Sequence, residues 1–177
     1  MTQSVELLLD DAADAQIRAQ WDRLGDAGLP TARRTEPSPH HAPHISLWAG
    51  GRLRDAAESR LPPLFTDLDL EVVIGGLLLF GPHRGGYILV RQVTVSTALA
   101  ALQQRVVEVC GSGYGGQFRD GRWSPHITLA RRMHTDQVGP ALQALSQAPA
   151  ELTATVRRAR RWDGDRKVAW LLSGSTS

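Results

Sequence analysis

The order of apolar and polar positions divides the chain into strands and helices in a mixed sequence. Between residues 68 and 74, leucine, valine and isoleucine alternate mainly with acidic residues, a period of two that is typical of a strand. Ile17, Trp21 and Leu24 instead recur at helical spacing. By these criteria strands are expected at 5–9, 44–49, 68–74, 77–80, 87–93, 123–130, 152–162 and 168–172, with Gly75-Gly76 interrupting the run from 68 to 80.

Four helices are expected between these strands. Asp10 or Asp11 can cap the first, and Ser96 the third, because short polar side chains accept hydrogen bonds from the free N–H groups at a helix start. Gly111 would close the third helix, and Thr135 can cap the fourth. The apolar faces expected for the second and fourth helices are Leu53, Ala57 and Leu61, ending at Pro62-Pro63, and Val138, Leu142 and Leu145.

Runs of neighbouring strands favour antiparallel sheets over a regular alternation of parallel strands and helices. With 177 residues, of which 42% are hydrophobic, the chain can form one compact domain or two small lobes that share a core. The Pro30–Pro43 stretch is rich in proline, arginine and histidine and indicates an exposed loop. We therefore expect a single α+β domain over residues 1–177.

Charge and cysteine content narrow the functional classes. The formal net charge is only +2, which argues against coating of long nucleic-acid duplexes but suits a small anion held in one basic groove. Cys110 is the only cysteine, so neither an internal disulfide nor a cysteine-based zinc site can form. The chain shows no signal peptide and no segment long enough to cross a bilayer, so we expect a cytoplasmic protein without membrane partners.

One internal repeat carries most of the functional information. Residues 42–47 read Ala-Pro-His-Ile-Ser-Leu, and residues 124–129 read Ser-Pro-His-Ile-Thr-Leu. The two histidines, His44 and His126, are 82 positions apart, and of the six histidines only these two have a hydroxyl residue two positions later. Residues i and i+2 of a strand point to the same side about 6.5 Å apart. Each strand would therefore present an imidazole beside a hydroxyl, with the apolar residues between them facing the core.

Two such strands across a groove would suit a phosphate group. The hydroxyls and a protonated imidazole can donate hydrogen bonds to its nonbridging oxygens. Cleaving a P–O bond in line requires a base on one side of phosphorus and an acid on the other. Histidine has a free pKa near neutrality, so a pair of histidines can hold both protonation states at once.

The twin His-x-Ser/Thr-apolar motifs resemble those of the 2H phosphoesterase superfamily, in particular its 2′-5′ RNA ligase-like, or RNA 2′,3′-cyclic phosphodiesterase, branch. The resemblance implies a bilobal fold of antiparallel sheets with flanking helices, related by a pseudo-twofold axis around a central groove. It also implies metal-independent opening of 2′,3′-cyclic phosphates, without a cofactor, and in some members reversible 2′-5′ RNA joining. The first motif carries Ser46 where Thr is more usual.

The resemblance assigns roles to individual residues. His44 and His126 correspond to the catalytic pair, and Ser46 and Thr128 to the phosphate-binding hydroxyls. Arg131 matches a basic residue that some ligase-like members carry shortly after the second motif. Strict alternation places Arg131 opposite His126, so it reaches a phosphate only if the strand bulges or ends there; otherwise it is a solvated surface residue.

Trp48 and the neighbouring pair His40 and His41 each have two interpretations. Trp48 alternates onto the face of His44 and could stack on a nucleobase; packing at the groove wall is the slightly favoured alternative. His40 and His41 could form a metal cluster with His44, but a flexible loop without acidic or cysteine partners favours a solvated role near the groove. Trp123, Phe80, Tyr87 and Trp162 are expected in the core or between the lobes.

Two further segments are considered for phosphate or RNA binding. The arginines between 157 and 161 could guide RNA or protect a sheet edge, with Arg158 and Arg160 on one face and Arg157 and Arg161 on the other. Residues 111–116 formally match a dinucleotide-binding glycine pattern, but they follow a helix and precede a strand, the reverse of the required context. They indicate a helix end and a mobile loop. No ATP-binding phosphate loop is present, which disfavours an ATP-driven ligase.

The leading hypothesis is therefore a cyclic phosphodiesterase acting on an RNA end or a small nucleotide cyclic phosphate, as a monomer. A 2′-5′ RNA ligase using the same groove is the alternative within enzymes. A nucleotide- or RNA-end-binding module without turnover is the alternative outside them, and a histidine-ligated metal protein is a third. The sequence leaves open which histidine starts as the base.

Overall fold

The computed structural model describes residues 2–36, 40–83, 85–114 and 121–172, which form two four-stranded antiparallel sheets. Sheet A has the order β2 (His44–Gly50), β1 (Gln3–Leu8), β7 (Arg158–Asp163) and β8 (Val168–Leu171). Sheet B has the order β5 (His126–Met133), β4 (Gly86–Val93), β3 (Leu70–His83) and β6 (Leu152–Val156). The motif strands β2 and β5 thus occupy the same place, at one end of each sheet. The expected α+β class with antiparallel sheets is confirmed.

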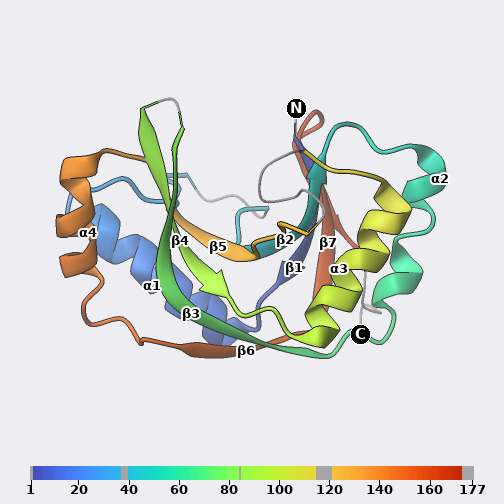
Figure 1. Cartoon of the computed structure of the whole chain (residues 1–177), viewed down its shortest axis with the longest axis horizontal. Helices are drawn as coiled ribbons and strands as arrows, with labels where there is room; N and C mark the ends of the chain where they lie inside the picture. The colour runs from blue at the N-terminus through green and yellow to red at the C-terminus, as the bar shows by residue number, and fades with distance from the viewer. Residues whose placement is uncertain (1, 37–39, 84, 115–120, 173–177) are drawn as a thin grey trace.

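The two sheets are built by the same chain path. In sheet A, β1 leads through helix α1 (Asp11–Asp26) to β2, and in sheet B, β4 leads through α3 (Thr97–Cys110) to β5. Each helix crosses to the other half: α1 contacts β5 and β6, whereas α3 contacts β2. Figure 1 shows α1 and α4 (Val138–Ala144) on one flank of the molecule, and α3 and α2 (Asp55–Glu58) on the other. The expected bilobal arrangement is confirmed.

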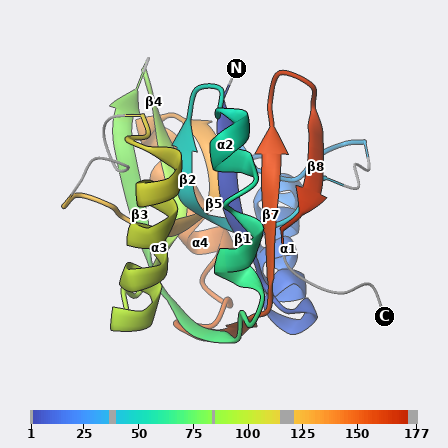
Figure 2. The ribbon, with the colours of Figure 1, turned by 90° about the vertical axis from the view of Figure 1, so that its right-hand side faces the viewer.

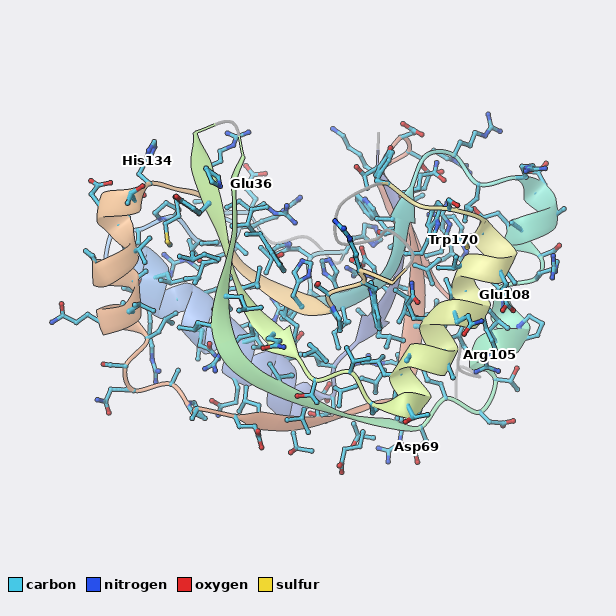
Figure 3. All side chains as sticks on the ribbon, viewed as in Figure 1. Glu36, Asp69, Arg105, Glu108, His134 and Trp170 are labelled. Carbon is cyan, nitrogen blue, oxygen red and sulfur yellow. The ribbon has the colours of Figure 1, made fainter. Side chains whose placement is uncertain are left out.

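Both long helices begin where the polar residues predicted. Asp10 Oδ1 accepts a hydrogen bond from Ala13 N at 2.9 Å, and Ser96 Oγ accepts one from Leu99 N at 3.2 Å. Gly111 ends α3 with a φ of 78°, a left-handed conformation that glycine adopts without strain. The outer face of α3 is solvated, and Figure 3 shows Arg105 and Glu108 projecting from it away from the sheets.

A single hydrophobic cluster runs through both halves. It includes Leu7 and Ile45 of sheet A, and Ile127 and Leu129 of sheet B, all with no exposed surface. Figure 2, which faces the flank of α2 and α3, shows these helices in front of the sheets that they cover. No described helix combines the length and the apolar character needed to cross a bilayer.

The short helices were predicted less well than the long ones. The second is reduced to the four residues of α2, and Pro62 begins a separate 3-10 turn, η1 (Pro62–Phe65), rather than ending a helix. Thr135 is the first residue of another 3-10 turn, η3 (Thr135–Gln137), and does not cap α4. Leu142 is 48% exposed, so the apolar face expected for α4 was wrong there, and Ala141 is buried instead.

Two expected strand boundaries were also wrong. Gly75 and Gly76 do not end a strand: β3 continues through them, with a shift of its register against β4 between Ile74 and Leu77. A pair of residues without side chains lets a strand bend without breaking. Conversely, the segment expected as one strand from 152 to 162 is two, because the chain passes from sheet B to sheet A at Arg157.

Candidate active site

The two motif strands line one cavity of about 560 Å³. Its wall includes the first two strands of each sheet, together with β7 and the loop before β2. His44, Ser46, His126, Thr128 and Arg131 all contribute to it. The structure therefore brings together five of the six residues singled out in the sequence.

Alternation along β2 and β5 places these side chains as expected. Ile45 and Leu47 have no exposed surface, whereas His44 and Ser46 on either side of Ile45 are partly exposed at the cavity. The second motif repeats this pattern, with Ile127 fully buried. Burial of the intervening apolar residues fixes the direction in which the polar ones point.

Both histidine rings are held by the same backbone contact. His44 Nδ1 lies 2.8 Å from the carbonyl oxygen of Ala42, and His126 Nδ1 lies 2.8 Å from that of Ser124. A carbonyl oxygen only accepts, so each Nδ1 carries the hydrogen. Nε2 is then the nitrogen of each ring that can gain or lose a proton, as an acid–base group requires.

The neighbours of the two rings differ. His44 Nε2 lies 3.5 Å from Oε1 of Glu6, a carboxylate that is only 4% exposed. The ring of His126 instead packs edge-on against Phe80, with 4.9 Å between the centroids. Burial lowers the pKa of His126 below its ordinary value, and the positive charges of His44 and Arg131 lower it further. The neutral form of His126 is thus favoured.

Glu6 and Phe80 were missed as site residues. Phe80 was expected in the core or between the lobes, and nothing in the strand pattern links it to His126. Glu6 did leave a signal, because it is the one charged residue within the apolar run Val5–Leu9. A carboxylate in a buried strand needs partners, and such positions are enriched near functional sites.

Arg131 reaches the cavity through bulges in β5. Leu129 and Ala130 are both fully buried, which breaks the alternation, and the register against β4 shifts on both sides of Leu89. Arg131 consequently faces the cavity together with His126 and Thr128. The irregularity that the sequence required for this placement is present.

The prediction that Trp48 faces the cavity is wrong. Its side chain is 3% exposed, does not line the cavity, and donates a hydrogen bond from Nε1 to Gly111 O at 2.9 Å. The register between β1 and β2 shifts between Val5 and Glu6, so Trp48 no longer shares the face of Ser46. It packs against the end of α3, and the expected nucleobase contact is wrong.

Other aromatic side chains line the cavity in its place. Trp162 is half-buried at the wall formed by β7, and Tyr114 is 46% exposed. Trp21 also borders the cavity but is only 3% exposed, and its ring stacks on His41 with centroids 5.0 Å apart. Trp162 and Tyr114, rather than Trp48, are the aromatic surface available to a ligand.

The two loop histidines do not form a metal cluster with His44. His41 Nε2 lies 2.8 Å from the carbonyl oxygen of Ala32, and the ring of His40 lies beside Trp162, with centroids 6.3 Å apart. Within the described parts of the chain, no group of three or more histidine, cysteine or acidic residues is arranged to hold a metal ion. Burial lowers the pKa of His41, and the nearby Arg34 adds to this effect.

The interpretation of the arginine run as protection of a sheet edge is wrong. Arg160 and Arg161 are buried and paired, Arg160 Nε with Glu6 Oε2 at 2.7 Å and Arg161 Nη2 with Glu58 Oε1 at 2.9 Å. Strand β7 lies inside sheet A rather than at its edge, and Arg157 lies before the strand. Arg160 and Arg161 therefore stabilise sheet A from within. Arg157 and Arg158 are exposed, and guidance of RNA by these residues stays a prediction.

The glycine-rich segment ends α3 and then lies against the first motif strand. Tyr114 N donates a hydrogen bond to Ala49 O at 2.7 Å, and a side chain at Gly113 would collide with the same oxygen. The helix end predicted at Gly111 is confirmed. The remainder of the expected loop, from Gly115 onward, lies outside the described residues.

Solved structures with the same fold define the class of protein. TT0787 of Thermus thermophilus is 18% identical, with a TM-score of 0.59 over 97% of this chain and 95% of that one. Escherichia coli LigT is 15% identical (TM-score 0.57; 96% and 93%), and Kluyveromyces marxianus Usb1 is 11% identical (TM-score 0.54; 97% and 97%). The chain thus shares the fold of these three proteins.

The family itself is shown by the sequence. Residues 10–167 match the model of the 2′-5′ RNA ligase superfamily, and the chain belongs to that superfamily. Among curated proteins, none matches the chain. The expected resemblance is confirmed, and a phosphoesterase or ligase type of activity follows from it.

Proposed function

We propose that this protein opens 2′,3′-cyclic phosphates at RNA ends or on nucleotides, without a metal, by acid–base catalysis with His44 and His126. The observation that carries the proposal is the convergence of both histidines on one cavity, each with its Nδ1 hydrogen held by a backbone carbonyl. Membership of the superfamily supports the same reaction class.

The reaction is hydrolysis of a cyclic diester. Water attacks phosphorus and gives a proton to Nε2 of one histidine, while the opposite P–O bond to the ribose breaks. The other histidine donates its Nε2 proton to the departing ribose oxygen, which leaves a phosphate monoester and a free hydroxyl. Ser46, Thr128 and Arg131 are suited to hold the nonbridging oxygens, since hydroxyls and a guanidinium donate hydrogen bonds to them.

A nucleotide or RNA end as ligand agrees with what relatives bind. LigT has been solved with 3′-AMP and Kluyveromyces marxianus Usb1 with uridine monophosphate, at 15% and 10% identity to this chain. The cavity here combines aromatic rings, Trp162 and Tyr114 among them, with arginines. Aromatic faces can stack on a base, and arginines attract phosphate.

Phosphorus NMR of 2′,3′-cyclic nucleotides and of cyclic-phosphate-ended RNA, in the presence of chelator, tests the proposal. We expect the wild-type protein to produce a monoester. His44→Ala and His126→Ala should each lower kcat by about 10²–10⁴-fold, because each removes a positioned acid or base. His134→Ala is the matched control, since His134 is exposed near α4 and remote from the cavity (Figure 3). Full activity in both site variants would refute the mechanism.

A 2′-5′ RNA ligase is the second candidate, and the name of the matching family favours it. In that reaction a ribose hydroxyl takes the place of water in the same cavity. Joining of RNA ends without ATP, lost in the same two histidine variants, would support it. Tight binding of cyclic phosphates with no product of either kind would instead indicate a binding module.

A further inference from the structure

Beside the first motif, a row of three polar residues crosses sheet A, and two of them are charged. Ser46 of β2 is paired with Glu6 of β1, and Glu6 is paired in turn with Arg160 of β7. Glu6 and Arg160 are both buried, and Glu6 is the only carboxylate among the described residues that line the cavity. A carboxylate in this cavity repels an anionic ligand, which suggests that Glu6 has a separate role there.

In the equivalent row of sheet B, the two residues beyond the motif hydroxyl are apolar. Thr128 of β5 is paired with Val90 of β4, and Val90 with Leu78 of β3. The two sheets have matching strand order, so Val90 stands where sheet A has Glu6. The motifs are alike, but the first has a buried Glu6–Arg160 ion pair where the second has Val90 and Leu78.

Every oxygen of Glu6 is engaged. Oε2 accepts a hydrogen bond from Arg160 Nε at 2.7 Å, while Oε1 accepts one from Ser4 Oγ at 2.6 Å and faces His44 Nε2 at 3.5 Å. Burial alone would raise the pKa of Glu6, but His44, Arg160 and Ser4 together lower it. Glu6 is therefore an ionised group with no free oxygen for a substrate, which excludes it as the acid or base itself.

The position of this carboxylate discriminates between the two forms of His44. With hydrogen fixed on Nδ1 by Ala42, neutral His44 would turn the lone pair of Nε2 toward an anion. Protonated His44 instead presents an N–H and a positive charge to it. A carboxylate at this distance attracts the second form and repels the lone pair of the first.

The other charged and titratable groups around the site act in the opposite sense. These groups are all cationic or can become so: His40 and His41 in the loop before β2, His126 and Arg131 on β5, Arg34 and Arg160. Each disfavours a further positive charge. Glu6 is the single described group in the cavity wall that offsets them at His44, and His126 has no such partner.

We propose that Glu6 is a positioning residue that keeps the proton on His44 Nε2, so that His44 is the acid and His126 the base of the hydrolysis. His126 takes a proton from water as oxygen bonds to phosphorus, and His44 gives its proton to the ribose oxygen as the P–O bond breaks. Solvent then returns a proton to His44 and removes one from His126. This assignment rests on the proposed two-histidine function.

The pH profile of Glu6→Gln tests the inference. Activity requires His126 neutral and His44 protonated, so kcat/KM has an acid limb set by His126 and an alkaline limb set by His44. In Glu6→Gln the alkaline limb should move to lower pH while the acid limb stays. We expect kcat/KM to fall about tenfold or more at pH 8 and clearly less at pH 6, against the 10²–10⁴-fold loss expected for removing the acid altogether.

Two further variants separate this effect from damage to the fold. Glu6→Gln leaves Arg160 buried without its carboxylate. The double variant Glu6→Gln/Arg160→Gln, which removes both charges, is therefore made in parallel. Its alkaline limb should move in the same direction but less far, because the opposing charge of Arg160 is also gone. Glu58→Gln is the matched control, because it deprives buried Arg161 of a carboxylate at a position that does not line the cavity. It should lower stability and leave both limbs in place.

NMR titration of the His44 and His126 ring protons provides a readout independent of turnover. In Glu6→Gln or the double variant, His44 should lose its proton at lower pH than in the wild type, with a smaller change at His126. An unchanged alkaline limb together with an unchanged His44 titration would overturn the inference while leaving the phosphodiesterase function intact. A wild-type protein without any hydrolysis would refute the function, and the titration would still decide whether Glu6 controls His44.

Discussion

At the scale of single residues, the proline before each motif histidine has a direct structural role. Pro43 and Pro125 restrict the residue before them to an extended conformation and fix their own φ. Both motifs place the carbonyl oxygen two residues before the histidine at 2.8 Å from Nδ1. The same tripeptide pattern thus produces the same tautomer twice.

Cys110 provides a prediction about a residue outside the site. Burial raises the pKa of its thiol to about 12, so very little thiolate is present at pH 8. We expect alkylation by iodoacetamide to be about 100-fold slower or more in the native protein than in urea, since the thiolate is the reactive form. Mass spectrometry over a time course measures both rates. Equal rates would show that the thiol is freely ionised.

The residues of the site were predictable only where a pattern repeats. His44 and His126 stand out because two similar hexapeptides are separated by almost half the chain. Glu6 and Phe80 belong to no repeated pattern. Glu6 interrupts an apolar run, but which groups it and Phe80 contact depends on which strands become neighbours in space. Trp48 was misplaced for a related reason: one register shift reverses the facing of every residue beyond it.

At the scale of elements, each motif strand is attached to the other half of the chain by an indole. Trp21 Nε1 of α1 donates to the carbonyl oxygen of Thr128 at 2.9 Å. Trp123 Nε1, which lies just before β5, donates to the carbonyl oxygen of Ser46 at 3.2 Å. In both cases the acceptor belongs to the hydroxyl residue of a motif. The two halves therefore fix each other's cavity-lining hydroxyl residues.

Trp21→Phe tests this attachment. The variant retains an aromatic ring but leaves the Thr128 carbonyl without its donor, so the free energy of unfolding should fall by about 1–3 kcal/mol. Urea unfolding measures the change. Trp170→Phe is the control: Trp170 is 40% exposed on β8, and its replacement should cost less than about 0.5 kcal/mol. Equal losses in the two variants would contradict the role of the indole hydrogen bond.

Strand and helix identities were largely predictable, and boundaries were predicted where capping residues or periodicity mark them. Asp10, Ser96 and Gly111 fixed the ends of α1 and α3 because their chemistry acts locally. The continuity of β3 through Gly75 and the break at Arg157 depend instead on pairing with distant strands. No local pattern encodes such pairing.

At the scale of the whole molecule, the two sheets share one core. Helix α1 follows the first strand of sheet A and packs on sheet B, and α3 does the reverse. The chain also returns from β6 in sheet B to β7 in sheet A. Neither half can bury the apolar face of its sheet alone, because the long helix that packs on that sheet belongs to the other half.

We therefore expect the protein to unfold in a single transition. Far-UV circular dichroism and tryptophan fluorescence should give coincident urea curves. Leu129→Ala, in the core of sheet B, should lower the free energy of unfolding by about 2–5 kcal/mol and shift both curves equally. Two separable transitions, or a shift confined to one probe, would show that the lobes are independent folding units.

The exchange of α1 and α3 between the halves also restricts how a substrate can enter. A protein with two lobes joined by a hinge can admit a ligand by swinging them apart. Here such a movement would pull each helix off the opposite sheet and expose the continuous apolar cluster to water, at a cost comparable to unfolding. The spacing of the two imidazoles is consequently set when the chain folds, and we expect ligands to reach them without separation of the two halves.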